Sequence, residues 1–230
     1  MRIDSRTNIA VIGVGGIGSN LVGSIASALS TGALVESLGG VNLALLDADT
    51  VEEKNILLGQ RFSHEDLGKT KVAAVREAAA GFESDLLVIE PMARDVRQPS
   101  DLPDSDITVV CVDNMGARGV VHGLRGPWLD LRCAGDAYLA LDHTVDPSVV
   151  ASLSQAQGAA QSCQLEGALE SGLLQAGFLA AAAHGYQWLI AALRQRAGMD
   201  NAMLPVPRSS SVTFGVLGRL PIDNEASTHV

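Results

Sequence analysis

The sequence predicts an α/β fold in which helices cover both faces of a mostly parallel sheet. Short apolar runs alternate with helical patterns through residue 135, and each alternation favours a right-handed crossover between parallel strands. Hydrophobic residues make up 47% of the 230 residues and aromatic residues only 3%, so small aliphatic side chains must build the core. We expect a single domain over 1–230, with a core at 1–135 and a C-terminal extension at 136–230.

Five apolar runs in the core are expected to be strands, and two intervening segments to be helices. The expected strands are 8–12, 41–47, 86–92, 105–114 and 126–135. The expected helices are 21–30 and 69–82.

After residue 135 the pattern changes. Residues 137–146 alternate weakly and favour an added antiparallel strand, and 209–223 favour a terminal hairpin or an edge strand. Residues 144–162 read either as a loose helix or as a mobile crossover. Residues 165–196 predict a long helix, broken near Gly172 or Gly177. Its apolar part, 173–193, contains a histidine, two glutamines and glycines, which favours a buried helix over a membrane span.

Charge and cysteine content exclude several classes of protein. The net charge of −10 disfavours a general affinity for nucleic acid or for an anionic membrane. Three cysteines without a CxxC pair exclude a four-cysteine zinc site and favour reduced thiols. Reduced thiols favour a cytoplasmic protein. No basic-then-apolar leader precedes residue 8, so we expect no signal peptide.

A glycine-rich loop joins the first strand to the first helix. Gly13, Gly15, Gly16 and Gly18 would let the backbone approach phosphates, at the positive end of the following helix. Asp47, at the end of the second strand, would hold ribose hydroxyls. This pattern predicts a Rossmann-like, nucleotide-binding core, but by itself it suits NAD or FAD as well as ATP.

The stretch LLDADTVEEKN at 45–55 contains more polar groups than a nicotinamide site needs. Asn55 and the lysines of the GKTK run, Lys69 and Lys71, suit phosphoryl or adenylyl transfer, where they could reach triphosphate oxygens. The alternative for both lysines is a solvated start of a helix.

Asp113 and Asn114 follow the expected central strand, at the ligand-binding edge of the sheet. A carboxylate there suits Mg²⁺ bound together with phosphate oxygens. The alternative is that this pair caps the helix that begins after it.

Together these groups resemble the ThiF/MoeB-type activating enzymes, which include the ubiquitin-activating enzymes. The shared pattern is a glycine loop, D-x-D-x-V-x-x-x-N from Asp47 to Asn55, G-x-x-K ending at Lys71, and D-N at 113–114 with Arg118 soon after. The resemblance covers residues 7–135 well and extends weakly to Cys163. The long insertion after the first helix is most similar to the short, stand-alone bacterial members.

The resemblance implies ATP and Mg²⁺ as cofactors of an adenylyltransferase. Asp47 would hold the ribose and Asp49 would shape the site near the phosphates. Asn55 and Lys71 would contact the triphosphate, and Asp113, with Asn114 beside it, would bind Mg²⁺. The reaction would join AMP to the C-terminal carboxylate of a small ubiquitin-like, β-grasp protein that ends in glycine, with release of pyrophosphate.

The resemblance also implies partners and a later step. Cys163 would attack the adenylate and hold the small protein as a thioester; the alternative is a thiol that only packs against the helix. A homodimer is expected, with a conjugating enzyme as a further partner. Cys111, inside the central strand, and Cys133, at the end of the fifth, are expected to be core thiols.

Two features depart from the family pattern. The family arginine three residues after Asn55 is replaced by Leu58, and Arg61, Arg2 or Arg6 would have to replace it. The paired CxxC motifs of many relatives are missing, so no zinc is expected.

Three alternatives to this activity stay open. A nicotinamide-dependent oxidoreductase leaves Asn55, Lys71 and Asp113 without a role. Leu58 keeps open a non-catalytic nucleotide- or protein-binding module of the same fold. A relative acting on an RNA-linked carboxylate is disfavoured by the acidic charge.

Overall fold

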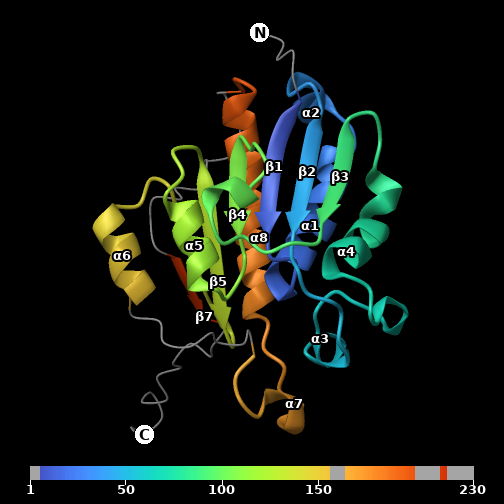
Figure 1. The fold of residues 1–230 in the computed structure, drawn as a ribbon, viewed down its shortest axis with the longest axis vertical. Coiled ribbons are helices and arrows are strands. Elements are labelled where there is room, and N and C mark those ends of the chain that lie inside the picture. Colours follow the sequence, from blue (N-terminus) through green and yellow to red (C-terminus); the bar gives the residue numbers. More distant parts are fainter. Residues whose placement is uncertain (1–5, 156–163, 200–212, 217–230) are drawn as a thin grey trace, which may run out of the picture.

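The computed structural model describes residues 6–155, 164–199 and 213–216 (Figure 1). The strands are β1 (Thr7–Ile12), β2 (Val41–Leu46), β3 (Leu87–Met92), β4 (Ile107–Val110), β5 (Trp128–Ala134), β6 (Ala137–Asp142) and β7 (Thr213–Val216). The helices are α1 (Gly16–Leu29), α2 (Ala33–Ser37), α3 (Glu53–Leu57), α4 (Lys71–Ala79), α5 (Met115–His122), α6 (Pro147–Gln155), α7 (Ala168–Ser171) and α8 (Gly177–Arg196). Short 3₁₀ turns lie at η1 (His64–Asp66), η2 (Ala80–Phe82) and η3 (Pro99–Asp101).

The seven strands form one mixed sheet in the order β3-β2-β1-β4-β5-β6-β7. Strands β1 to β5 are parallel, and β6 and β7 are added antiparallel at one edge. This arrangement confirms the predicted Rossmann-like fold class, including the antiparallel strands at the C-terminal end. The chain order reverses between β1 and β4, where α/β sheets of this kind bind their ligands.

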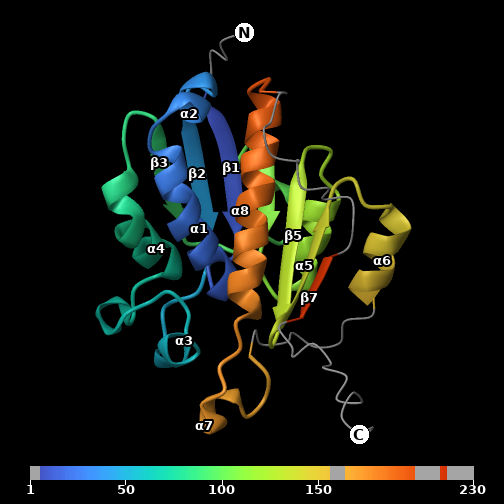
Figure 2. The same cartoon turned by 180° about the vertical axis from the view of Figure 1, so that it is seen from behind.

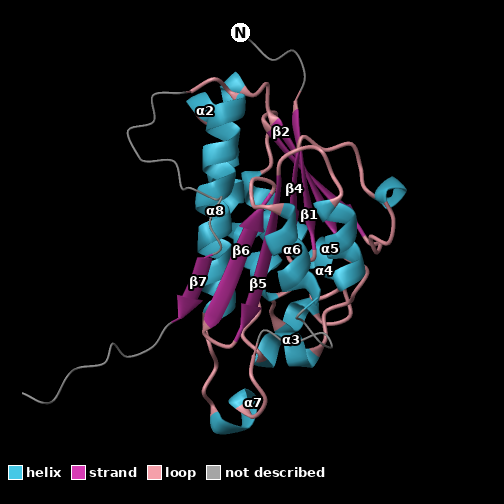
Figure 3. Ribbon diagram, turned by 90° about the vertical axis from the view of Figure 1, so that its left-hand side faces the viewer, coloured by secondary structure: helices cyan, strands magenta, loops and turns pink. Residues whose placement is uncertain are grey.

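Helices cover both faces of the sheet. Figure 2 shows α1, α4 and α8 on one face, and Figure 3 shows α5 and α6 on the side opposite α8. The larger core cluster joins the first face to the sheet through side chains such as Leu21, Ile25 and Leu189. A smaller cluster, which includes Val121 and Trp128, lies under α5. Aliphatic side chains make up most of both clusters, as the low aromatic content predicts.

Strand β4 is shorter than predicted, and this changes the position of Cys111. The strand ends at Val110 and residues 111–114 follow it as a loop, although the Cys111 N–H still donates to the Ile12 carbonyl of β1 at 2.7 Å. Cys111 therefore lies one residue past the strand and not inside it, but it packs against the larger core cluster, as predicted for a core thiol. Its half-buried side chain borders the cavity described below.

The C-terminal segment is two helices separated by a loop, as the glycine positions predict. Gly172 ends α7 in the left-handed conformation, with a φ of 68°, and Gly177 begins α8. Gln164 and Gln175 close this loop, since the Gln164 side chain bonds both the N–H and the carbonyl of Gln175. The predicted edge strand is β7, and the region expected to be a loose helix or a crossover contains α6.

Helix α8 is fixed to the sheet at several points along its length. The indole Nε1 of Trp188 donates to the buried carboxylate of Asp142 at 2.8 Å. Near its C-terminal end, Arg196 pairs with Asp106 at 2.7 Å and donates to Thr7 Oγ1. The described residues contain no helix of the length and apolarity that a bilayer crossing requires. A single domain over 1–230 stays a prediction.

The first residue of α8 is expected to tolerate no side chain. A Cβ on Gly177 would lie 2.4 Å from the carbonyl oxygen of Gly135 and 2.6 Å from that of Ala137, both of them backbone atoms. We expect Gly177→Ala to lower the free energy of unfolding by about 1–3 kcal/mol. The matched control is Gly119→Ala in α5, where a Cβ meets nothing within 4 Å, and it should raise stability by about 0.5–1 kcal/mol. Equal changes in chemical denaturation would contradict the close approach of α8 to this turn.

Candidate active site

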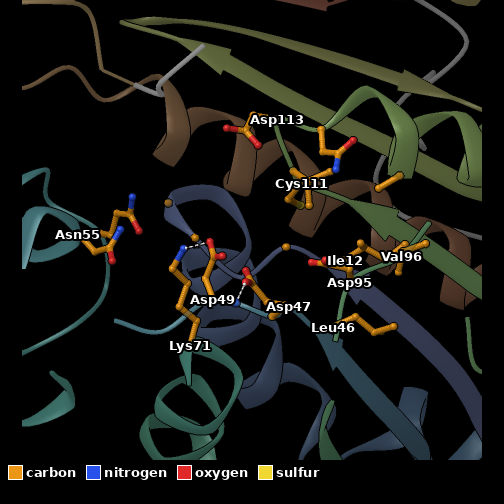
Figure 4. Close-up of a pocket in the computed structure, with 18 of the residues that line it drawn as sticks. Ile12, Leu46, Asp47, Asp49, Asn55, Lys71, Asp95, Val96, Cys111 and Asp113 are labelled. Carbon is orange, nitrogen blue, oxygen red and sulfur yellow. Dashed lines mark hydrogen bonds and ion pairs between the residues drawn. The ribbon is translucent and has the colours of Figure 1, made fainter. Parts of the chain in front are cut away.

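A cavity of about 630 Å³ lies at the carboxyl ends of the parallel strands, at the point where the chain order reverses (Figure 4). It is lined by the glycine loop, the segment after β2, helix α3, the start of α4 and the loops after β3 and β4. The predicted site residues among its lining are Gly13, Gly15, Gly16, Asp47, Asp49, Asn55, Lys71, Asp113 and Asn114. Residues far apart in the sequence are therefore brought to one hollow.

The glycine loop depends on the absence of side chains at two positions. Gly13 has a φ of 84°, and a Cβ there would lie 2.6 Å from Val112 Cγ1 in the loop after β4. A Cβ on Gly18 would lie 2.0 Å from the carbonyl oxygen of Gly13, so Gly18 lets α1 approach the turn. Around Gly15 the nearest neighbour of a Cβ is Gln60 Oε1 at 3.7 Å, which leaves the loop open toward the cavity.

Asp47 connects the end of β2 to the glycine loop. One carboxylate oxygen accepts the Val14 N–H at 2.8 Å, and the other accepts the Asp49 N–H at 3.0 Å. Burial raises the pKa of Asp47 above its ordinary value, although these two hydrogen bonds and the Lys71 ammonium act in the opposite direction. Oxygens bonded to two amides still have lone pairs for further donors, such as ribose hydroxyls.

Lys71 is held over the cavity by Asp49. Its Nζ lies 2.7 Å from Asp49 Oδ2, and only 11% of its side chain is exposed. The backbone repeats the pairing, since Lys71 N–H donates to the Asp49 carbonyl at 2.9 Å. Lys69 instead pairs with Asp66 and Glu77 at the surface. The interpretation as a solvated helix start thus holds for Lys69 but not for Lys71.

Asn55 is both a cavity residue and a cap. It is 4% exposed, and its Oδ1 accepts the N–H of Glu52 at the start of α3. Its Nδ2 donates no hydrogen bond within the described part of the chain, so it stays available to a ligand. Glu52 is the N-cap residue of this short helix.

The loop after β4 presents a carboxylate next to a cap. Asn114 is the N-cap of α5, where its Oδ1 accepts the Gly116 N–H at 2.7 Å. Asp113 is exposed and borders the cavity. Among the described residues, no three His, Cys, Asp or Glu side chains gather as a ready-made metal site. A single carboxylate beside a phosphate-binding loop nevertheless suits Mg²⁺, which keeps waters and phosphate oxygens as its other ligands.

The structure does not bring every predicted residue to the cavity. The guanidinium of Arg61 lies over Gly23 of α1, and Arg6 lies beside Gly40, at the amino ends of the strands. Leu58, at the position of the missing family arginine, borders the cavity. Arg2 and Cys163 lie outside the described residues. Cys133 packs against the larger core cluster, as predicted.

Several lining residues were not predicted. Lys54 reaches the cavity from α3, and Arg94 and Asp95 come from the loop after β3. Arg94 and Asp95 could have been found, since they follow a parallel strand at its carboxyl end as Asp47 and Asp113 do. The buried side chains of Ile12, Leu46 and Val96 form an apolar wall.

A second cavity of about 610 Å³ adjoins the first and shares Leu58 with it. Its lining comes from Leu58, Ala134 and the loop that carries α7, residues 164–170. Exposed leucines gather at this end of the molecule: Leu57, Leu165, Leu169, Leu173 and Leu174. The expectation of a buried helix over 173–193 is wrong at its start, because Leu173 and Leu174 lie exposed in the loop before α8.

The pairing of Lys71 predicts a pH dependence. Lys71→Met removes a group that lowers the pKa of Asp47, so that pKa should rise further. A carboxyl whose folded pKa exceeds its unfolded value loses stability as pH rises from near 3.8 through the folded pKa. Relative to the wild type, the variant should therefore lose unfolding free energy as pH rises from near 3.8 through the folded pKa of Asp47. Loss of the Lys71–Asp49 ion pair should add no more than about 1 kcal/mol, because Asp49 is largely exposed.

Denaturation at several pH values, with NMR titration of the Asp47 carboxyl, measures both effects. Lys69→Met is the matched control, because that lysine is paired at the surface with Asp66 and Glu77. An unchanged Asp47 titration in Lys71→Met would contradict the electrostatic coupling.

Comparison with known proteins agrees with the fold and with the family resemblance. The model of the ThiF family matches residues 4–198. Among solved structures, MccB of E. coli with MccA superposes with a TM-score of 0.59 at 15% identity, covering 94% of this chain and 65% of that one. MccB with ATP gives 0.56 at 15% identity, with the same coverages of 94% and 65%. PaaA gives 0.57 at 14% identity, covering 93% of this chain and 65% of its own.

These similarities at low identity establish the fold, and this chain spans 65% of the length of the MccB chains. A search of curated protein sequences gives no match. Because the family model covers most of its residues, the chain belongs to the ThiF family.

Proposed function

We propose that this chain uses ATP to adenylylate the C-terminal carboxylate of a small protein or peptide. The observation that carries the proposal is one cavity in which an open glycine loop, the Lys71–Asp49 pair and the exposed Asp113 face one another. A nicotinamide site would use the glycine loop and Asp47 but would leave the other groups without a partner.

The cavity offers a distinct place for each part of ATP. The first turn of α1 carries no acidic residue, so its N–H groups and positive dipole end suit the triphosphate. Asp47 suits the ribose hydroxyls. The apolar wall of Ile12, Leu46 and Val96 suits the base.

In the proposed reaction a carboxylate oxygen attacks the α-phosphorus of ATP. A new oxygen–phosphorus bond forms, the bond from the α-phosphorus to the bridging oxygen breaks, and pyrophosphate leaves with that electron pair. Lys71 has two ammonium hydrogens beyond the one directed at Asp49, so it can donate to phosphate oxygens without leaving its partner. The Nδ2 of Asn55 adds a neutral donor on the same side of the cavity.

Asp113 would hold Mg²⁺ in this scheme, and the ion, when bound, would neutralise charge on the phosphates. Its open position at the cavity rim leaves room for a nucleotide to supply further ligands.

Arg94 is a candidate for the positive charge missing at Leu58. Lys54 is already neutralised by Glu52 at 2.6 Å. The only hydrogen bond of the Arg94 guanidinium within the described part of the chain is to Met92 Sδ, at 3.5 Å. Arg94 could therefore turn toward an anionic nucleotide without breaking an ion pair. It borders the cavity from the loop after β3, whereas Leu58 follows α3.

The second cavity is the proposed path for the substrate's C-terminal segment. It adjoins the nucleotide cavity at Leu58, and its leucines would bury apolar side chains. Glu166 and Glu170 in its lining favour a segment that also carries a basic residue. MccB, a structural relative, has been crystallised with MccA. A ubiquitin-like protein ending in glycine, a thioester at Cys163, a homodimer, a conjugating partner and a cytoplasmic location stay predictions.

Calorimetric titration with ATP and Mg²⁺ tests the nucleotide site. We expect Asp113→Ala to weaken binding at least about tenfold, which is about 1.4 kcal/mol. Asp104→Ala is the matched control, because Asp104 is also an exposed aspartate but precedes β4 at the opposite edge of the sheet. NAD should not bind. Exchange of labelled pyrophosphate into ATP, dependent on a small protein with a free C-terminus, would then establish the reaction.

The alternatives give different results. NAD binding without ATP binding would overturn the proposal in favour of an oxidoreductase. ATP binding without pyrophosphate exchange would favour the non-catalytic module that Leu58 keeps open. Exchange that depends on an acylated RNA would identify the RNA-linked branch of the family.

A further inference from the structure

A buried carboxylate lies behind the loop that carries Asp113. Asp130, in β5, is 0% exposed and points toward α5. Its Oδ2 accepts from His122 Nε2 at 3.0 Å and from Arg132 Nε and Nη2 at 3.0 and 2.7 Å. The Nε of Arg118 lies 3.4 Å from its Oδ1. One carboxylate thus joins three basic side chains from two elements.

The basic side chains around Asp130 favour its charged form. Burial alone would raise the pKa of Asp130, but His122, Arg118 and Arg132 together hold it below its ordinary value. Separating a buried charge from its partners is strongly destabilising. The side chains around Asp130 are consequently held in one arrangement, and their other hydrogen bonds are fixed with them.

Arg118 connects the cluster to the loop that lines the nucleotide cavity. Arg118 Nη2 donates to the carbonyl of Val112 at 2.5 Å, and Val112 directly precedes Asp113. Asn114 holds the other side of Asp113 as the cap of α5. The backbone on both sides of this exposed carboxylate is therefore anchored, while the carboxylate itself remains open to the cavity.

Arg132 connects the cluster to α6, away from the cavity. Arg132 Nη1 donates to the carbonyl of Leu153 in α6 at 3.0 Å. Arg118 and Arg132 are both buried arginines on one carboxylate, but only Arg118 contacts the loop after β4. The two arginines form a natural pair for comparison.

We infer that Asp130 is a positioning residue that acts through Arg118 to fix the Val112–Asp113 backbone for binding of a magnesium nucleotide. The inference rests on the proposed function for its ligand, but the backbone anchoring can be measured without any ligand. Neither Asp130 nor Arg118 borders the cavity, so neither would touch the nucleotide.

The test compares Arg118→Lys with Arg132→Lys. A lysine keeps the charge next to Asp130 but cannot also donate to a backbone carbonyl with the fixed fork of a guanidinium. We expect Arg118→Lys to weaken binding of ATP in the presence of Mg²⁺ by about tenfold or more, as loss of a residue that supports a metal ligand does. Binding of ATP in EDTA should change less than about twofold, and amides of 112–117 should exchange hydrogen faster. Arg132→Lys should lower stability without either change.

Each result decides the inference. Equal effects of the two variants on magnesium-dependent binding and on exchange of 112–117 would overturn it and leave a purely structural cluster. Asp130→Asn should reproduce the magnesium-specific loss of Arg118→Lys, and if this variant does not fold, Arg118→Lys decides alone. If the wild type binds no ATP, the proposed function fails, and the exchange data then support or overturn the anchoring by themselves.

Discussion

The hydrogen bond from the Val14 amide to Asp47 is the contact on which the arrangement of the site depends. It joins the glycine loop, which follows β1, to the end of β2, and so fixes the distance between the positions proposed for phosphate and ribose. The same carboxylate accepts the amide of Asp49, which in turn holds Lys71. Burial raises the pKa of this half-buried carboxylate, and the hydrogen bonds from the two amides act against that rise.

Some of the charged side chains that line the cavity form ion pairs, and others do not. Lys71 with Asp49, and Lys54 with Glu52, are ion pairs that cancel before any ligand arrives. Asp113 and Arg94 form no ion pair within the described part of the chain, and they lie on loops after different strands. A magnesium nucleotide would bring the opposite charge to each of these two groups, and this complementarity favours it over a neutral ligand.

Most of the fold and much of the site could be predicted, because their signals are local. Apolar runs ending at Gly13 and Asp47 indicate strands that meet a ligand, and Lys71 closes the short G-x-x-K motif. Cys111 was misplaced because an apolar run does not show where pairing with neighbouring strands stops. Arg94 was overlooked because a charged side chain after an edge strand is typical of an ordinary solvent-exposed loop. Arg61 was expected near the phosphates, but its side chain packs over Gly23, a contact invisible in the sequence.

The early end of β4 and the buried charge of Asp130 have a common structural consequence. The ladder hydrogen bonds of this strand end at the Cys111 N–H, which donates to the Ile12 carbonyl one residue before the carbonyl that Arg118 holds. Arg118 supports this backbone from α5, and it can do so only because Asp130 in the next strand balances its buried charge. A side-chain network thereby fixes the backbone where strand pairing ends, in the loop that borders the cavity. Neither Asp130 nor Arg118 shows this role in the sequence, where one reads as part of a strand and the other as part of a motif.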